Sequence, residues 1–183
     1  QSLFGTIVGA QIENISFENV RFTAVANGLA VRMMHHYNEV DDDGNTISGE
    51  MTIAYNVLKN IALDFVYDYN GIKGICGGYY GGGLENVFLN MRMSDGKSFN
   101  KSADYAFTDE FFLWRSNNYI NNFIVLAEQG EVSLDWHVNI GSLDVGKETI
   151  FVCGNNMEAC YKARTIFDPV VWSVVPGELP KLK

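Results

Sequence analysis

The stretch IENISF, at residues 12–17, is the first of four copies of one phrase in this chain. The phrase has an apolar residue first, asparagine third, and apolar residues fourth and sixth. The other copies are LKNIAL at residues 58–63, LENVFL at 84–89 and INNFIV at 120–125. Alternation of this kind is typical of a β-strand with one buried face, and the recurring asparagine marks a fixed bend in that strand.

The asparagine has a physical reason to recur. It tolerates the left-handed backbone region better than most residues with a side chain. Its amide can also hydrogen-bond its own backbone, or the asparagine of a copy stacked above or below. We therefore predict an all-β fold, a short irregular right-handed parallel β-helix (solenoid) with hairpin insertions, as a single domain over residues 1–183.

The copies are unevenly spaced, which predicts connections of unequal length. The asparagines Asn14, Asn60, Asn86 and Asn122 are separated by 46, 26 and 36 positions (60 − 14, 86 − 60, 122 − 86). Loops tolerate insertion far better than packed strands do. The longest insertion, at about residues 24–56, contains DDDGN, a hairpin signal.

A second strand is expected before each phrase. Apolar runs at residues 3–8, 72–76, 111–114 and 150–153 each lead into glycine, asparagine or serine, which suit a tight corner. A loop is expected at residues 96–102. Residues 157–167 form the one helical candidate, which Cys160 and Thr165 weaken.

Stacking the four phrases predicts which side chains point inward. We expect a core that includes Ile12, Ile15, Phe17, Leu58, Ile61, Leu63, Leu84, Val87, Leu89, Ile120, Phe123 and Val125. Three outward columns follow from the same alignment: Glu13, Lys59, Glu85, Asn121; then Ser16, Ala62, Phe88, Ile124; then Glu18, Asp64, Asn90, Leu126.

The outward columns bear on function. Glu18 and Asp64 fall in adjacent copies, where parallel strands lie about 4.8 Å apart, and glycoside hydrolysis needs two nearby carboxyls. No cation or aromatic cleft is evident beside them, so catalysis is not favoured. Phe88 and Ile124 make the second column apolar, which requires a cover from a long insertion or from a neighbouring chain.

Aromatic side chains supply further binding candidates. Tyr79 and Tyr80 lie in a glycine-rich stretch, where their rings suit sugar stacking or protein contact, or pack on the body of the fold. Trp114 closes the run at residues 111–114. The candidate binding residues are Tyr79, Tyr80, Phe88, Ile124 and Trp114.

Composition limits the classes of partner. The net charge of −9 argues against nucleic acid, which needs clustered lysine and arginine. No apolar run approaches the roughly 20 residues that span a bilayer, so no membrane insertion is expected. The opening QSLFGT is already strand-like, which favours a piece of a longer polypeptide.

Neither a metal nor a cofactor is expected. The acidic DDDGN at residues 41–45 lacks the glycine and glutamate spacing of a calcium loop, and GSLDVGKE at 141–148 lacks the hydroxyl of a phosphate loop. Cys76, Cys153 and Cys160 are either buried thiols or include a Cys153–Cys160 disulfide.

The closing segment, residues 167–183, reads FDPVVWSVVPGELPKLK. It resembles the end of glycine-rich, GLUG-like β-helical repeat proteins on the surface of gut bacteria, and similar coils occur in bacteriophage appendage proteins. The resemblance implies a non-catalytic structural or adhesive module that is extracellular, on a cell surface or on a virion. Its partners would be neighbouring subunits, further domains of the same polypeptide, or a glycan. A carbohydrate-binding or carbohydrate-cleaving β-helix is the alternative.

Overall fold

The computed structural model describes residues 1–34, 36–37, 43, 52–53, 55–106, 110–111, 119–130, 132 and 150–183. Strands dominate, which confirms the all-β prediction. The long strands are β2 (Gln11–Phe22), β6 (Val57–Tyr67), β8 (Gly83–Met93) and β10 (Tyr119–Leu126). The shorter elements are β1 (Phe4–Val8), β3 (Ala30–Met34), β4 (His36–Tyr37), β5 (Thr52–Ile53), β7 (Cys76–Tyr79), β9 (Glu110–Phe111), β11 (Ile150–Cys153), α1 (Asn156–Ile166), β12 (Trp172–Ser173) and β13 (Lys181–Leu182).

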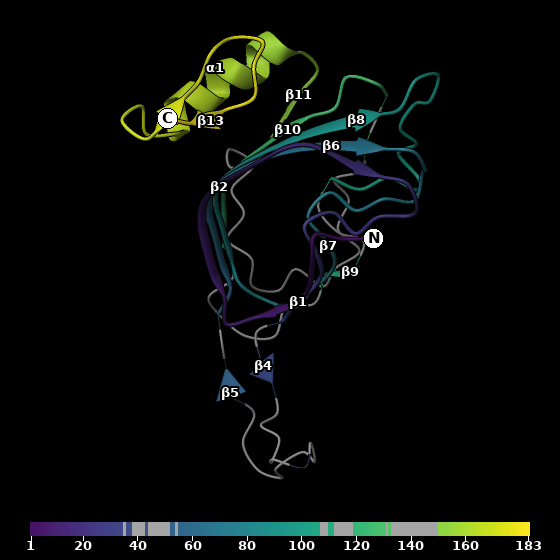
Figure 1. Ribbon diagram of the computed structural model, residues 1–183, viewed down its shortest axis with the longest axis vertical. Coiled ribbons are helices and arrows are strands. Elements are labelled where there is room, and N and C mark those ends of the chain that lie inside the picture. The colour runs from purple at the N-terminus through teal and green to yellow at the C-terminus, as the bar shows by residue number, and fades with distance from the viewer. Residues whose placement is uncertain are drawn as a thin grey trace.

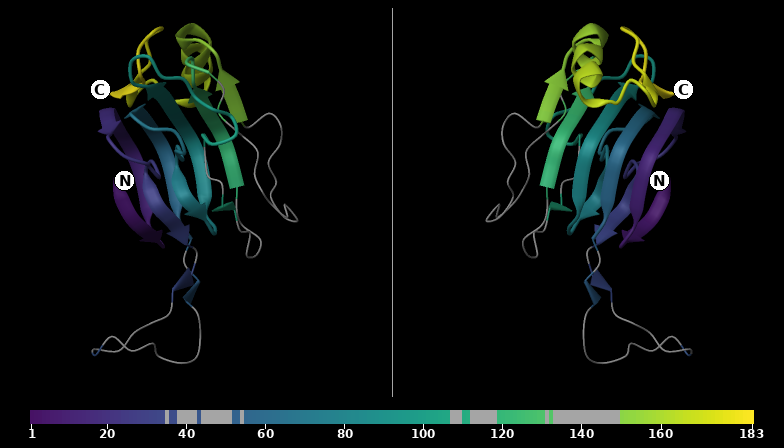
Figure 2. Two further views of the ribbon diagram at one scale, coloured as in Figure 1. Left: turned by 90° about the vertical axis from the view of Figure 1, so that its right-hand side faces the viewer. Right: turned by 90° about the vertical axis from the view of Figure 1, so that its left-hand side faces the viewer.

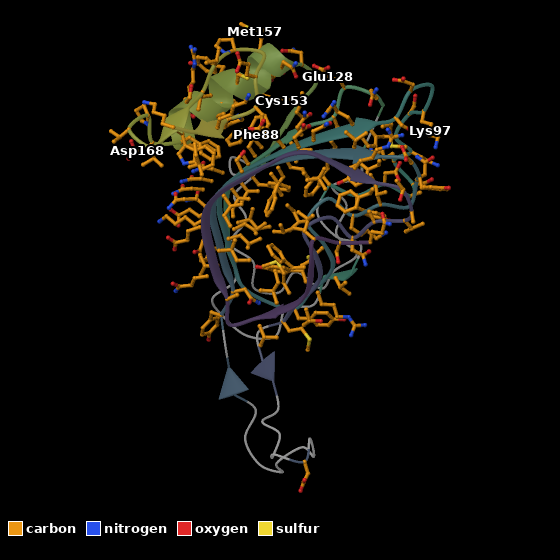
Figure 3. The ribbon with its side chains drawn as sticks, in the orientation of Figure 1. Phe88, Lys97, Glu128, Cys153, Met157 and Asp168 are labelled. Carbon is orange, nitrogen blue, oxygen red and sulfur yellow. The ribbon has the colours of Figure 1, made fainter. Side chains whose placement is uncertain are left out.

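Two parallel sheets form the body of the molecule. The first has the strand order β1-β3-β7-β9, and the second has the order β11-β10-β8-β6-β2. The chain passes from a strand of the first sheet to a strand of the second and then returns, so each phrase of the sequence adds one strand to the second sheet. The two sheets face each other (Figure 1), and apolar side chains fill the space between them (Figure 3).

The predicted register is confirmed along the phrases. Leu58 lies opposite Leu84, Ile61 opposite Val87, and Leu63 opposite Leu89. All predicted core residues of the second, third and fourth copies are buried. Those of the first copy, in β2, are only half-buried because β2 is the outermost strand of its sheet.

The four asparagines adopt the left-handed conformation and bond to one another. Their φ angles are 54°, 52°, 55° and 58° in chain order. The Nδ2 of Asn60 donates to Oδ1 of Asn14 at 3.1 Å, Asn86 donates to Asn60 at 2.9 Å, and Asn122 donates to Asn86 at 2.9 Å. We call Asn14, Asn60, Asn86 and Asn122 the asparagine ladder. It shows both properties predicted for the bend, the left-handed backbone and the hydrogen bond between stacked copies.

Several predicted strands in the connections need correction. Residues 30–34 form a strand of the first sheet, so the insertion after the first phrase is shorter than residues 24–56. The strand predicted at 72–76 lies instead at Cys76–Tyr79, because the tight bend uses Gly81 and Gly82, both with positive φ, rather than Gly77 and Gly78. The strand Ile150–Cys153 pairs with β10 in the second sheet and does not precede another phrase.

Other connections agree with the sequence. β4 and β5 pair antiparallel in the insertion, as a hairpin requires, and extend away from the body (Figure 1). The turn around Gly96 is present. The helix α1 occupies Asn156–Ile166, where Asn155 caps its first turn by accepting a hydrogen bond from the Glu158 N–H at 2.8 Å.

The outward apolar column is covered by the chain's own C-terminal part. We call α1 together with residues 167–183 the C-terminal cover. It packs Ala159, Ala163, Phe167 and Trp172 against Phe88 and the rest of the column. α1 contacts β10 and β11, whereas β13 contacts β2, so the cover runs from one side of the second sheet to the other (Figure 2).

Candidate functional site

A polar groove lies at the carboxyl ends of the strands of the second sheet. Its larger part, of about 380 Å³, is lined by Arg21, Val66, Arg92, Met93, Ser94, Asp95 and Gln129. A smaller part of about 150 Å³ shares Arg92 and Gln129 and adds Asn90, Met91, Glu128 and Asn156. Polar and charged side chains therefore make up most of the lining.

The sheet register fixes the spacing of the two arginines. Arg21 lies opposite Val66, and Val66 lies opposite Arg92. Because neighbouring strands are about 4.8 Å apart, the backbones that carry the two arginines are separated by about 10 Å. The apolar Val66 lies between them on the same face of the sheet.

Arg92 is held in place by a partly buried carboxylate. Its Nε and Nη2 donate to the two oxygens of Asp64 at 3.0 and 2.7 Å. Asp64 also accepts hydrogen bonds from Asn90 Nδ2 at 2.8 Å and from the backbone N–H of Asn19 at 3.0 Å. A bidentate pair of this kind fixes the plane of the guanidinium as well as its position.

Arg21 is oriented in the same way by Asp68. Its Nε and Nη2 donate to the two carboxylate oxygens at 3.1 and 2.9 Å. The hydrogen bond from Arg21 lowers the pKa of Asp68, and the same bond raises the pKa of the guanidinium. Both arginines therefore reach the groove as positioned donors that are already neutralised by a carboxylate.

The far side of the groove is built by the segment after β10. Gln129 Oε1 accepts the backbone N–H of Met93 at 2.5 Å. Glu128 Oε1 accepts the backbone N–H of Asn156 at 2.9 Å, at the first turn of α1, where the helix dipole favours a negative charge. Glu128 therefore ties this wall to the start of α1 (Figure 3).

The predicted carboxylate pair is not assembled as a catalytic pair. A bulge between Phe17 and Val20 takes Glu18 out of register with Asp64, and Asn19 occupies the bulge with a φ of 55°. Glu18 instead lies 3.8 Å from Lys181 of the C-terminal cover. The cation that the sequence did not reveal beside Asp64 is Arg92.

The first outward column brings opposite charges together on neighbouring strands. Lys59 lies between Glu13 and Glu85 in register, and its Nζ is 2.9 Å from Glu85 Oε1. This pairing between strands raises the pKa of Lys59, mainly through the hydrogen bond to Glu85. It is an ordinary partly exposed ion pair that contributes little to stability.

The predicted binding residues are dispersed, and most are covered. Phe88 (labelled in Figure 3) lies beneath the C-terminal cover. Ile124 is buried in the same cluster, so what shields this column is neither a long insertion nor a neighbouring chain. Tyr79 is buried, and its hydroxyl donates to the carbonyl of Gly82. Tyr80 is half-buried. Trp114 lies outside the described residues, as do the acidic stretch at 41–45 apart from Asp43 and the stretch at 141–148.

A second buried carboxylate is also used structurally. Asp104 accepts hydrogen bonds from Asn70 Nδ2 at 2.7 Å and from the backbone N–H groups of Gly71 and Asn100 at 2.6 and 2.7 Å. It thereby joins two loops. The buried carboxylates of the described chain, Asp64 and Asp104, are thus both hydrogen-bonded within the protein.

The three cysteines are buried, and none of them forms a disulfide. Cys160 Sγ donates to the carbonyl of Glu178 at 3.2 Å, and burial raises the pKa of Cys153 to about 11. Among the residues that the structure describes, no group of three histidine, cysteine or acidic residues is arranged to hold a metal ion.

The groove was missed by sequence reasoning, although the register contained a signal. Continuing the phrase by two further positions beyond Asn90 reaches the next outward residue of the strand. That step gives Val66 in β6 and Arg92 in β8, whereas in β2 it gives Val20, and only the bulge brings Arg21 into the same row. Gln129 and Glu128 lie after β10, and the position of this loop could not be read from the strand pattern.

The comparisons with known proteins found no matching family model, curated protein or solved structure. No helix in the described part of the chain is long and apolar enough to cross a membrane.

Proposed function

We propose that this protein is a non-catalytic structural or adhesive module of an extracellular or virion surface, built as a short right-handed parallel β-helix. The asparagine ladder carries the proposal. Four neighbouring strands of the second sheet each carry an asparagine with nearly the same left-handed φ, and three amide hydrogen bonds join them. Such a ladder supports a structural role, in which successive repeats stack on one another. The resemblance of residues 167–183 to GLUG-like surface proteins favours the surface setting.

The use of the carboxylates supports a non-catalytic role. Asp64 is neutralised by Arg92, Glu18 lies beside Lys181, and Asp104 joins two loops. Retaining glycosidases need two carboxyl groups about 5–5.5 Å apart, and one of them must be able to exchange a proton. Asp64 is bonded on both oxygens and is poorly suited to either task.

A reducing-sugar assay over a panel of plant, bacterial and host polysaccharides tests this proposal. We expect no release of sugar ends by the intact protein. Release that is lost in both Glu18→Gln and Asp64→Asn, but kept in the control Glu13→Gln on the same strand, would refute the non-catalytic role. Circular dichroism and thermal unfolding of each variant separate lost activity from lost fold.

Carbohydrate binding without cleavage is the second candidate, and the polar groove favours it. Two fixed guanidinium groups, the carboxylate of Asp95 and the side chain of Ser94 offer donors and acceptors around a hollow of about 380 Å³. That volume falls within the range of small-molecule sites, about 300–1,000 Å³. The mixture of charges suits hydroxyl groups better than a strongly anionic ligand, because each arginine is already paired.

A glycan array followed by titration tests the second candidate. We expect Asp95→Ala to weaken any binding in the groove by about tenfold, the effect of losing one or two hydrogen bonds. Glu13→Ala, on the outward face away from the groove lining, should leave binding unchanged. Equal loss in both variants, or binding unaffected by Asp95→Ala, would exclude the groove as the glycan site.

A further inference from the structure

The two sheets end on the same side of the molecule. β1 is the outermost strand of the first sheet, and β2 is the outermost strand of the second. The chain joins them directly through residues 9–10, so together they form one continuous face (Figure 2). The outer backbone N–H and C=O groups of such edge strands are available to pair with another strand.

The apolar residues on this face are incompletely covered. Ile12, Ile15 and Phe17 are half-buried, whereas their partners in β6 (Leu58, Ile61 and Leu63) have no exposed surface. The difference comes from position, because both strands carry the same phrase. One more strand of this phrase against β2 would give the first copy the same burial as the second.

The asparagine ladder has a direction, and Asn14 lies at its end. Each asparagine donates its Nδ2 to the Oδ1 of the preceding copy. Asn14 accepts from Asn60, and within the described part of the chain its own Nδ2 donates to no acceptor. The face therefore presents an amide donor at a fixed position, on a residue with a φ of 54°.

This direction disfavours pairing of two copies through the same face. A two-fold axis would bring two identical surfaces together. Each chain would then place the Asn14 amide N–H where the Asn14 of the other chain needs an oxygen. A parallel strand that carries an asparagine at the matching bend would supply the Oδ1 that Asn14 lacks. The ladder thus selects the kind of partner as well as its orientation.

The bulge sets the length of the face. β2 pairs with β6 in unbroken register from Gln11 to Phe17, and the register shifts between Phe17 and Val20. Bulges and charged residues are devices by which edge strands avoid unwanted pairing. Beyond the bulge, Arg21 is bonded to Asp68. The part of β2 that is fit to pair is therefore Gln11–Phe17.

We propose that β1 and residues 11–17 of β2 form a docking face for a further repeat of the same phrase. The partner is a parallel pair of strands with the pattern apolar, any residue, asparagine, apolar, any residue, apolar, and its asparagine Oδ1 accepts from Asn14 Nδ2. This inference rests on the proposed function as a stacking module and names the partner of that module.

The internal spacing of the chain gives a direct test. Phe4 lies opposite Ala30, 26 positions later, and Asn60 bonds to Asn86, also 26 positions later. A second copy of residues 4–29 inserted before Phe4 would continue the stack in register. In that extended protein Leu29 of the copy would take the place of Leu3, whose N–H donates to Gly28 O in the parent at 3.1 Å.

Amide hydrogen exchange is the measurement. We expect exchange within residues 11–17 of the original β2 to slow by about tenfold or more in the extended protein, with much less change after the bulge. In a second insert the copy of Asn14 is changed to glycine, which keeps the left-handed backbone but removes the acceptor. This insert should slow exchange less than the unchanged insert does. An insert of scrambled sequence should give none.

Three outcomes would overturn the proposal. They are unchanged exchange at residues 11–17 while β8 remains protected, equal protection by the scrambled insert, and a parent dimer in which residues 11–17 are protected by self-pairing. Sedimentation of the parent checks the last outcome. None of these results depends on sugar release, so a failure here is distinguishable from a failure of the non-catalytic role.

Discussion

Replacing Asn86 tests the asparagine ladder at its centre. Its side chain donates to Asn60 and accepts from Asn122, each at 2.9 Å, and its φ of 55° is in the left-handed region. Asn86→Gly keeps that backbone accessible and removes both amide bonds. At about 0.5–1.5 kcal/mol for each bond, the free energy of unfolding should fall by about 1–3 kcal/mol.

Asn86→Ala removes the same two bonds and adds backbone strain. A left-handed conformation costs a residue with a Cβ about 1–2 kcal/mol, so we expect a total loss of about 2–5 kcal/mol. The difference between the alanine and glycine variants isolates the backbone contribution. Asn14→Gly, at the end of the ladder, loses only one bond and should cost about 0.5–1.5 kcal/mol.

Urea unfolding of the three variants gives these free energies from the midpoint and slope. Asn121→Ala is the matched control, because Asn121 is exposed beside the ladder and outside it, and a surface change of this kind should stay within about 0.5 kcal/mol. If Asn86→Gly costs no more than Asn121→Ala, the ladder does not stabilise the stack. If alanine and glycine cost the same at position 86, the explanation from backbone conformation is wrong.

Three further predictions concern the core, the cover and pH. Leu89→Ala should lower the unfolding free energy by about 2–5 kcal/mol because Leu89 is fully buried, and an effect below 1 kcal/mol in urea unfolding would contradict its place in the core. Phe88→Ala should cost about 3–5 kcal/mol by leaving a cavity under the C-terminal cover, whereas Tyr161→Ala, on the exposed side of α1, should be nearly neutral in the same assay. The unfolding free energy should fall as pH rises from about 8.5 towards 11, because Cys153 loses its proton near 8.5 in the unfolded chain but only near its raised pKa of about 11 in the folded protein. Urea unfolding at several pH values should show a smaller decline in Cys153→Ala. An identical decline would refute the role of Cys153 in this pH dependence.

The inward side of the fold could be predicted from the sequence because one phrase repeats. Alternation fixes which residues share a face, and the asparagine fixes where each strand bends, so Leu58, Leu84 and Ile120 could be aligned without coordinates. The bulge at Asn19 was missed because it adds one residue to one strand of a pair. That addition removed the proposed pairing of Glu18 with Asp64.

The cover and the groove were not predictable in the same way. Phe88 and Ile124 indicated that something must shield them, but the sequence did not show that α1 and Trp172 would fold back to do so. Ile150–Cys153 looked like earlier runs that lead into a phrase, yet it extends the second sheet. The groove depends on where the loop with Gln129 lies relative to Arg92, which is a property of tertiary packing.

The C-terminal cover has a consequence for biosynthesis. The column that it shields belongs to β6, β8 and β10, all of which leave the ribosome before α1 and the closing strands do. Repeats that stack as they emerge would expose Phe88 and Ile124 until residues 156–183 have also emerged. Partly folded chains with exposed apolar surface are prone to aggregate. A nascent chain stalled before α1 should therefore need a chaperone, whereas a chain that has released residues 156–183 closes over its own apolar column.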